Sequence, residues 1–584
     1  MCQPVEAKNI PVPTSLAYFA PSLIQTNGGG TVGPHKLYGP AQIDVDTSTA
    51  LAKGSVLVYN ESTAKWNVQS NTLNIGYGTY GNTPGSVNVG VRNATGTQGQ
   101  GCLTLGYQTG INQSDGSIAI GFQAAGDPVL VQNEVAVALG NRAGFAAQGL
   151  GAVAIGGRAA GWGSGGEPFT VGQGQGSVAL GYQAAYSPQG DFALALGPYA
   201  GYSNQEASCV AVGDRAAGYG NDVGETDPTF QGSGAIALGS KAGYFSQGNN
   251  SIALGVESGL SLQNSFAIAI GYQAAGYKEV APDPPAPQNS GAIAIGSTAG
   301  YRNQGGQSIG IGNQAGYQDQ GQQSVAIGKS AGLNTQGQFA IAIGSDAGGT
   351  TQGAEGLALG TAAGSINQGT RALALGYQSG SANQLTQAIS IGSQSGYKDQ
   401  GQYAVAIGSG SAGYGTGPQE TRLGGQNDYS VAIGYNSAYF KQGFTSVAVG
   451  YRAAGYAPIN TDPVNLPGQG EGAIAIGADA AYREQGDFSI AIGHSAGFTA
   501  LGTNSIAIGQ LANNLRTNFN NTIVISATGV ALNPDKSNAC FLAPVRDGSA
   551  DPVVTTLNTV QLPAGFKVMA YNAATSEVIT VGGA

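Results

Sequence analysis

The sequence predicts an all-β fold, a β-solenoid of about 25 coils, on the strength of three observations. A short phrase ending in glycine, such as SVAIG, recurs from Gly76 to Gly509, and 16 of the 24 intervals between these glycines are 16 residues long. Apolar and small residues alternate within each phrase, as in Val325, Ala326 and Ile327. The chain also has 99 glycines in 584 residues and only 9% charged residues, unlike an ordinary globular domain.

Each coil is expected to hold two short strands and two turns. The alternating phrase suits a first strand, and the glycine that ends it, the marker glycine, turns the chain. A second strand is expected at two small residues followed by Tyr or Leu, as at 315–317, and a second turn at the Gln-Gly pair that follows. Stacked coils would cover the Val and Ile side chains in one apolar column and share backbone hydrogen bonds. Such a rod would be about 120 Å long.

Two columns of side chains follow from the register. One column is expected to stack its amides along the axis as a structural ladder, with a polar ligand-binding stripe as the alternative. It contains Gln304, Gln320, Gln336, Gln352, Gln368, Gln384 and Gln400. The other column exchanges aromatic residues with leucine, which favours packing, including a subunit contact, over a carbohydrate-stacking stripe. It contains Tyr186, Tyr202, Tyr244, Tyr301, Tyr317, Tyr397, Tyr439 and Tyr482, and also Leu260, Leu333 and Phe498.

Five coils carry longer intervals, after Gly156, Gly213, Gly271, Gly408 and Gly450. The extra residues are expected between the second strand and the next alternating phrase, so they would project from one edge of the rod, where repeat proteins often place binding. Solvated decoration without a ligand is the alternative. The candidate receptor-binding residues are Trp162, Phe169, Phe230 and Tyr414.

Chemistry other than binding finds little support in the sequence. The phrase Gly328-Lys329-Ser330 lacks the earlier glycine of a phosphate-binding loop, and the two histidines, His35 and His494, have no positioned partner that would indicate catalysis. We expect no enzyme activity and no cofactor.

Metal, nucleic acid and membrane insertion are not expected either. The acids of the insertions lack the spacing of a calcium loop; they are Asp222, Glu225, Asp227, Asp283 and Asp462. A net charge of −10 without a basic cluster argues against nucleic acid. No segment approaches 18 uninterrupted apolar residues, and four widely spaced cysteines indicate isolated thiols.

The phrases SVAIGKSAG, SIALGVESG and FAIAIGSDAG resemble the head repeat of trimeric autotransporter adhesins of the YadA type, over residues 71–513. The resemblance implies a left-handed parallel β-roll, three copies of which pack side by side into a homotrimer that binds surfaces. On this interpretation the small residues Ala326, Ala342 and Ala374 would allow close approach between the copies.

The two ends differ from the repeat. Residues 514–584 resemble the segment that closes repeat regions in fibre proteins of phages and large viruses, with the phrases NNTIVISATG, LAPVR and YNAATSEV, and would cap or trimerise the rod. Residues 1–70 contain a hairpin-like phrase, GSVLVYNESTAKWNVQS, and would form a cap or an attachment end.

The sequence therefore favours a structural fibre or spike protein on a virion surface. It would bind a host glycan or protein receptor and would join other virion proteins at one end. No secretion signal, heptad stalk or membrane barrel is recognisable, which favours this reading over a cellular trimeric adhesin at the cell surface. A purely architectural spacer is the third possibility.

Overall fold

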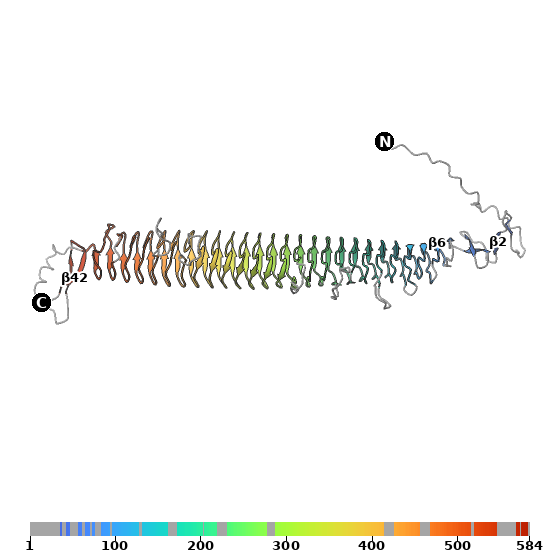
Figure 1. The fold of residues 1–584 in the computed structure, drawn as a ribbon, viewed down its shortest axis with the longest axis horizontal. Helices are drawn as coiled ribbons and strands as arrows, with labels where there is room; N and C mark the ends of the chain where they lie inside the picture. The colour runs from blue at the N-terminus through green and yellow to red at the C-terminus, as the bar shows by residue number, and fades with distance from the viewer. Residues whose placement is uncertain are drawn as a thin grey trace, which may run out of the picture.

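A computed structural model describes the chain at residues 83–93, 96–127, 131–161, 172–202, 204–218, 230–276, 287–413, 425–455, 468–515, 519–545 and 574–576, and at the strands β1 to β5, β41 and β42. These residues form an all-β parallel solenoid of about 25 coils without a helix, which confirms the predicted fold class. The coils stack into a long rod with the chain running from one end to the other (Figure 1).

One strand from every coil joins a single parallel column, in which equivalent residues of successive coils pair, as Ile341 with Leu357. We call these the marker strands, because each ends within one residue of a marker glycine or its equivalent. They are β5 (Leu73–Ile75), β6 (Val87–Val91), β7 (Leu103–Tyr107), β8 (Ile118–Phe122), β9 (Val137–Leu139), β10 (Val153–Ile155), β11 (Val178–Leu180), β12 (Leu194–Leu196), β14 (Val210–Val212), β16 (Ile236–Leu238), β17 (Ile252–Leu254), β18 (Ile268–Ile270), β19 (Ile293–Ile295), β21 (Ile309–Ile311), β23 (Val325–Ile327), β25 (Ile341–Ile343), β27 (Leu357–Leu359), β29 (Leu373–Leu375), β31 (Ile389–Ile391), β33 (Val405–Ile407), β34 (Val431–Ile433), β35 (Val447–Val449), β36 (Ile474–Ile476), β37 (Ile490–Ile492), β38 (Ile506–Ile508), β39 (Ile523–Ser526) and β40 (Cys540–Ala543).

The marker glycines lie on top of one another along the rod. Gly344 has φ +128°, and a Cβ placed on it would lie 2.5 Å from the carbonyl oxygen of Gly360 in the next coil. Both the backbone conformation and the close approach therefore require glycine. The same contact recurs from coil to coil, which accounts for the most regular feature of the sequence.

The second strand of each coil is not where the sequence analysis placed it. The small-small-Tyr segment, as at 315–317, forms the turn after the marker glycine, and the strand lies at the glutamine that follows, which is part of the strand and not of a turn. Elsewhere this glutamine strand shrinks to a single bridge, such as Gln148 with Gln173. The named glutamine strands are β13 (Asn204–Gln205), β15 (Phe230–Gln231), β20 (Arg302–Gln304), β22 (Gln318–Gln320), β24 (Thr335–Gln336), β26 (Thr351–Gln352), β28 (Ile366–Gln368), β30 (Ala382–Gln384) and β32 (Lys398–Gln400).

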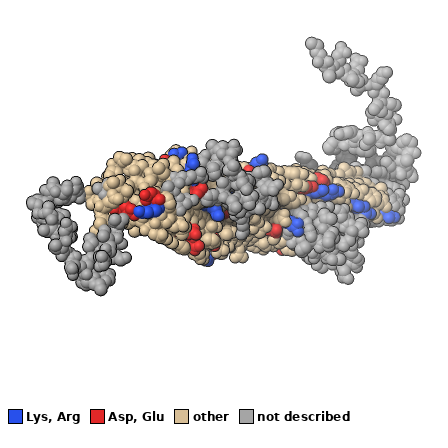
Figure 2. Space-filling model, turned by 60° about the vertical axis from the view of Figure 1, so that its left-hand side comes forward, with Lys and Arg blue, Asp and Glu red and all other residues tan. Residues whose placement is uncertain are grey.

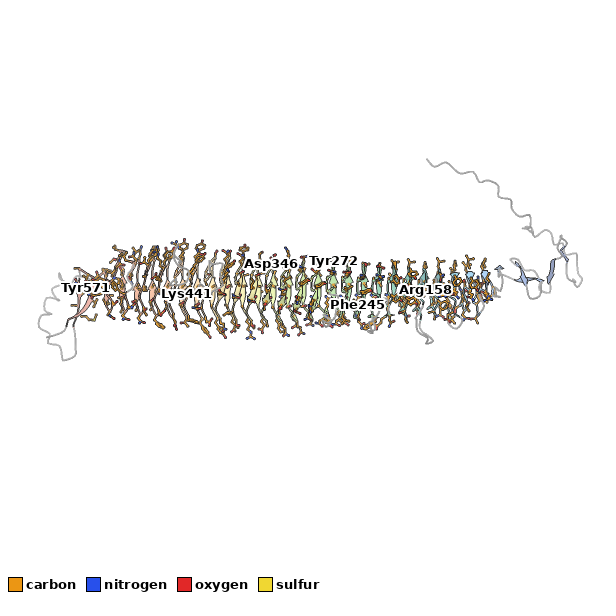
Figure 3. The ribbon with its side chains drawn as sticks, in the orientation of Figure 1. Arg158, Phe245, Tyr272, Asp346, Lys441 and Tyr571 are labelled. Atoms are coloured by element: carbon orange, nitrogen blue, oxygen red, sulfur yellow. The ribbon has the colours of Figure 1, made fainter. Side chains whose placement is uncertain are left out.

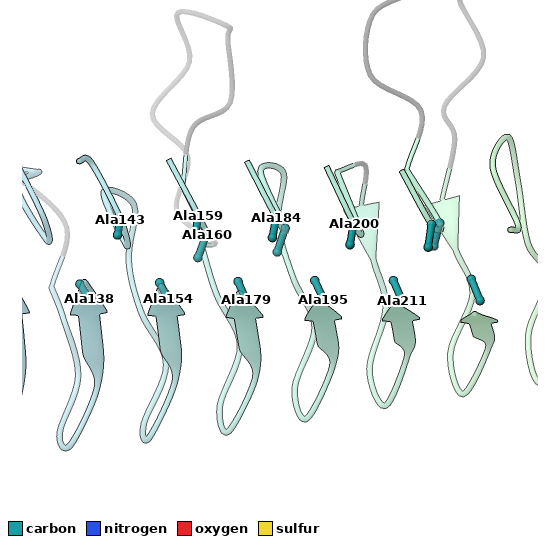
Figure 4. Packing of buried hydrophobic residues seen from close by; sticks show 14 of the residues in the cluster. Ala138, Ala143, Ala154, Ala159, Ala160, Ala179, Ala184, Ala195, Ala200 and Ala211 are labelled. Carbon is teal, nitrogen blue, oxygen red and sulfur yellow. The ribbon is translucent and has the colours of Figure 1, made fainter. Parts of the chain in front are cut away.

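The interior of the coil is built from alanine and glutamine, not from the branched residues of the marker strands. Ala326, Ala342 and Ala374 are 0% exposed, so the expectation that they face a neighbouring copy is wrong. The Val and Ile that flank them point outward, so the expected burial of these side chains within one chain is also wrong. Two rows of alanine face each other across the interior (Figure 4). That spacing leaves room for methyl groups but not for isoleucine.

Glutamine fills the rest of the interior and joins the two faces of the coil. Nε2 of Gln336 donates to the carbonyl oxygen of Val325 on the marker strand, at 2.9 Å, and to Oε1 of Gln352 in the next coil, at 3.0 Å. Such amide-to-amide bonds continue from Gln113 to Gln442 at 2.7–3.3 Å. A buried amide that makes all these bonds avoids the cost of an unpaired polar group.

The ends of the rod replace this interior. Near the first coils the buried positions are polar: the side chains of Asn88 and Gln98 exchange two hydrogen bonds of 3.1 and 2.7 Å. At the other end the glutamine position becomes Leu501, and the alanine position becomes Val524 and then Phe541, all buried. The marker column therefore continues past residue 513, through β39 and β40.

Two small elements lie outside the parallel column. The predicted N-terminal hairpin is confirmed: β3 (Val56–Asn60) pairs antiparallel with β4 (Lys65–Gln69), in a sheet completed by β2 (Ile43–Asp46) and β1 (Lys36–Leu37). At the C-terminal end, β41 (Val568–Asn572) and β42 (Glu577–Val581) form a hairpin, and β42 pairs antiparallel with β40. Lys536 Nζ lies 2.7 Å from the buried Glu577 carboxylate and holds this hairpin against the last coil.

Candidate functional site

The largest distinctive surface of the rod is the outer side of the marker strands, which we call the strand face. In the 25 marker strands from β6 to β39, the residues on either side of the buried central residue are Val, Ile or Leu at all 50 positions. None of these side chains is buried, and those of Leu139, Leu238 and Ile476 are 38–41% exposed. An uninterrupted apolar ribbon therefore runs along the rod for on the order of 100 Å.

An apolar ribbon of this size is unusual for a chain that remains alone in water. The largest apolar patch of a typical monomer is a few hundred Å², and two rows of half-exposed aliphatic side chains over about 25 coils exceed that severalfold. Apolar area removed from water contributes roughly 25 cal/mol per Å². The strand face therefore has the character of an interface between protein chains.

Exposed aromatic residues flank the strand face on both sides. On one side is the corner position, five residues before each marker glycine, which has a positive φ in all 24 coils from Gly90 to Gly509. This conformation disfavours bulky residues, yet six coils place an exposed ring there: Phe192, Phe266, Phe339, Tyr403, Tyr429 and Phe488, at 45–64% exposure.

On the other side, the residue directly after the marker glycine is aromatic in seven of the 24 coils from Gly90 to Gly509. Tyr272 is 54% exposed and lies at the edge of the rod (Figure 3). The full set is Tyr107, Phe122, Tyr182, Tyr272, Tyr377, Tyr435 and Tyr451. The surface is thus four residue columns wide: the two middle columns are aliphatic throughout, and the two marginal columns carry exposed rings in six and seven of the 24 coils.

The column of Tyr186 and its equivalents packs against itself. The rings of Tyr301 and Tyr317 lie 5.0 Å apart and 5° from parallel, and Tyr186 stacks on Tyr202 at 4.9 Å. Burial raises the pKa of Tyr186 and Tyr202 above the ordinary value. In these pairs the two rings cover each other's facing sides along the axis. A sugar stacks on an open ring face. The geometry favours the packing interpretation.

The seven glutamines Gln304 to Gln400 are at most 3% exposed, so they line no surface and the ligand-stripe alternative fails. Their position in the interior is what the sequence analysis missed. The signal that would have found it is their constant spacing to the marker strand, eight residues before the next marker glycine, even across insertions.

The five insertions all leave the rod at one corner, but not the expected one. They lie between the turn after the marker glycine and the glutamine strand: 162–171 precede Gln173, and 219–229 precede β15. Trp162, Phe169 and Tyr414 lie outside the described residues. Phe230 begins β15, where it is 41% exposed and pairs with Asn204.

The residues that could supply acid, base or metal chemistry are only partly described by the structure. Asp222, Glu225, Asp227, Asp283, Asp462 and His35 lie outside the described residues. Among the residues that are described, no three His, Cys, Asp or Glu side chains gather as a metal site would require. His494 is exposed, with Nδ1 3.3 Å from Oγ of Ser495, and Lys329 is exposed beside the buried Ser330. Charged side chains are sparse on the face seen in Figure 2.

Known proteins add no identification. No family model matches the chain, and no curated protein is similar to it. Within the described part of the structure, no helix is long and apolar enough to cross a membrane.

Proposed function

We propose that this chain is a structural, non-enzymatic fibre or spike protein of a virus, that it assembles as a homotrimer of parallel β-solenoids, and that it serves attachment to a host cell surface. The observation that carries the proposal is the strand face. A rod with an aliphatic ribbon along its whole length reaches a low free energy when copies of itself cover that ribbon.

The number three and the viral setting rest on resemblance. The repeat resembles the heads of trimeric adhesins, in which three copies pack side by side, and the C-terminal segment resembles the closing segment of viral fibres. Attachment is supported by the position of the insertions: all five leave the same corner of the coil, which is not part of the strand face. A trimer would therefore present them outward along its length.

Assembly is tested by the mass of the purified full-length chain in solution, measured by native mass spectrometry or light scattering. We expect three times the chain mass at micromolar concentration. A monomer at that concentration contradicts the proposal, because the ribbon would then be stable in water.

Attachment is tested by trimming the five insertions to the 16-residue period and measuring binding of the assembled protein to a glycan panel and to cells. We expect binding by the full chain and its loss in the trimmed variant. The matched control deletes residues 345–360, one whole coil, which preserves the register and every insertion and should preserve binding. An assembled full chain that binds no cell and no glycan supports the spacer and contradicts attachment.

A further inference from the structure

The charges within and next to these four columns are not distributed evenly. Within the four columns, over the 24 coils from Gly90 to Gly509, only four of 96 residues are charged. The two columns that border them, one on either side, together contain 15 charged residues in 48 positions. This abrupt change resembles the boundary between the core and the rim of a protein interface, where charge is depleted in the core. The four charged residues within are Asp214, Lys329, Glu355 and Arg371.

Glu355 and Arg371 already neutralise each other. They occupy the corner position of adjacent coils, and the guanidinium donates to the carboxylate at 3.0 and 3.1 Å. The paired guanidinium lowers the pKa of the Glu355 carboxyl below its usual range. The corner column therefore presents no net charge to a neighbouring copy.

The two bordering columns have net charges of opposite sign. The column six residues before the marker glycine, the acidic rim, holds acids and no bases: Asp115, Glu134, Asp191, Asp428, Glu471 and Asp487. The column two residues after the marker glycine, the basic rim, holds six bases: Arg92, Arg142, Arg158, Arg215, Lys241 and Arg452.

Three acids also lie in the basic rim, and two of them are already paired. Glu257 lies 3.8 Å from Lys241, and Asp479 lies 2.8 Å from Arg452 on the adjacent coil. The third is Asp346. With six bases and three acids the basic rim remains positive, whereas the acidic rim carries six negative charges and no base.

The geometry of a ring of parallel rods determines which rims meet. When copies are related by rotation about an axis along the rod, the contact is heterologous: one margin of the strand face in each copy meets the other margin in the next. Antiparallel pairs would instead bring acidic rim to acidic rim and basic rim to basic rim. Opposite charges attract across an interface, and like charges repel.

We infer that the acidic rim of one copy lies against the basic rim of the next, and that these two rims fix the parallel, ring-like association of the chains. This inference rests on the proposed self-assembly. The rims can also fix how far one copy is shifted along the rod relative to the next. The strand face cannot do so, because Val, Ile and Leu repeat in every coil, whereas charged rim residues occur only in some coils. Glu134 and Arg142 belong to the same coil, and Asp191 and Arg215 belong to adjacent coils.

The contact is tested by cysteine cross-linking in the full chain with Cys2 and Cys540 changed to Ser. Gln322→Cys is placed in the acidic rim column, and Lys329→Cys lies at the opposite margin of the same coil; both native side chains are exposed. A chain carrying both cysteines should form a covalent trimer on mild oxidation, because each copy links to the next around the ring. Asn313→Cys or Ser345→Cys in place of Lys329→Cys tests an offset of one coil.

The single-cysteine chains are the controls. We expect at least about tenfold less covalent product from either of them alone than from the double variant. Two results would overturn the inference and leave the proposed trimer intact. One is covalent dimers from Gln322→Cys alone. The other is a trimeric mass without cross-links when Gln322→Cys is combined with any of the three partner cysteines. A monomeric mass would overturn the proposed function instead.

Charge reversal gives an independent measurement. Glu134→Lys with Glu471→Lys lowers the charge of the acidic rim from −6 to −2, and we expect about a tenfold weaker association at low salt, with the difference shrinking at high salt. Adding Arg142→Glu, which lies in the same coil as Glu134, restores opposite charges at that coil and should recover part of the affinity. Equal association of all three proteins would contradict the inference, and far-ultraviolet circular dichroism verifies that each remains folded.

Discussion

The two long faces of each coil differ in how much variation they accept. The marker strands keep the same three-residue pattern from one end of the rod to the other, with an aliphatic residue on each side of the buried central residue from β6 to β39. The side of the coil that carries the glutamine strands, the glutamine face, is a continuous sheet only from β20 to β32. Elsewhere it is reduced mostly to single bridges, and all five insertions lie at its margin.

The reason for this difference lies in the glutamine side chain. In the coil with the first insertion, Nε2 of Gln173 still donates to the carbonyl oxygen of Val153 at 2.8 Å. One side chain thus closes the coil whatever the length of chain before it, so the backbone pairing around it can be minimal. The marker strands have no such side chain and depend on regular strand pairing, so extra residues cannot be inserted into them.

The largest effect is expected for a charge placed at the buried central residue of a marker strand. Ala342→Asp would bury a carboxylate between Ala326 and Ala358, all 0% exposed, at a cost of about 3 to 5 kcal/mol. We expect local unfolding around β25, measured by hydrogen exchange and by the denaturant midpoint. An unchanged midpoint would show that the interior is open to water.

The neighbouring residue tests the outside of the same strand. Ile343→Asp points outward, so we expect the rod to keep its secondary structure while the association constant falls by about tenfold or more. The measurement is mass against concentration, with circular dichroism as the check on folding. Thr351→Asp, on the outer side of the glutamine face, is the matched control and should leave the mass unchanged. Equal mass for all three proteins would place the interface elsewhere.

A smaller effect is expected at the glutamine ladder. Gln352→Leu removes the donor to the Ile341 carbonyl at 2.8 Å and the acceptor for Nε2 of Gln336 at 3.0 Å. Leaving these groups unpaired costs about 1 to 3 kcal/mol, seen as a lower denaturant midpoint. The control is Gln338→Leu, an exposed glutamine in the same region. Because leucine takes this position naturally at Leu501, a neutral result would mean that shape matters there more than hydrogen bonding.

The smallest effect concerns thiol reactivity inside and outside the marker face. Burial raises the pKa of the Cys209 thiol from 9.0 to about 11, and the residue is 0% exposed. The test uses the Ile343→Asp variant, because the outer face stays accessible when copies do not associate. In this variant a maleimide should modify the partly exposed Cys540 and leave Cys209 intact until the protein unfolds. Modification of both at the same rate would contradict the inward placement of Cys209.

The raised pKa also fixes the sign of a pH effect. The unfolded chain loses the Cys209 proton near the ordinary value, whereas the folded chain keeps it to about pH 11. Stability contributed by this thiol is therefore complete below pH 9 and declines as the pH rises through this window. Cys209→Ala should reduce the alkaline loss of stability, measured as the denaturant midpoint at pH 8 and pH 10.

The sequence by itself determined the period, the fold class, the positions of the marker strands and the alignment of the marker glycines, because each depends on recurrence along the chain. Alternation in a strand shows that successive side chains point to opposite sides, but not which side is inside. Only the tertiary structure decided that, because the interior is a narrow space in which the marker strands face a second row of alanines and the buried glutamines. Alanine fits that width and isoleucine does not, so the branched residues lie outside, where a second copy can cover them.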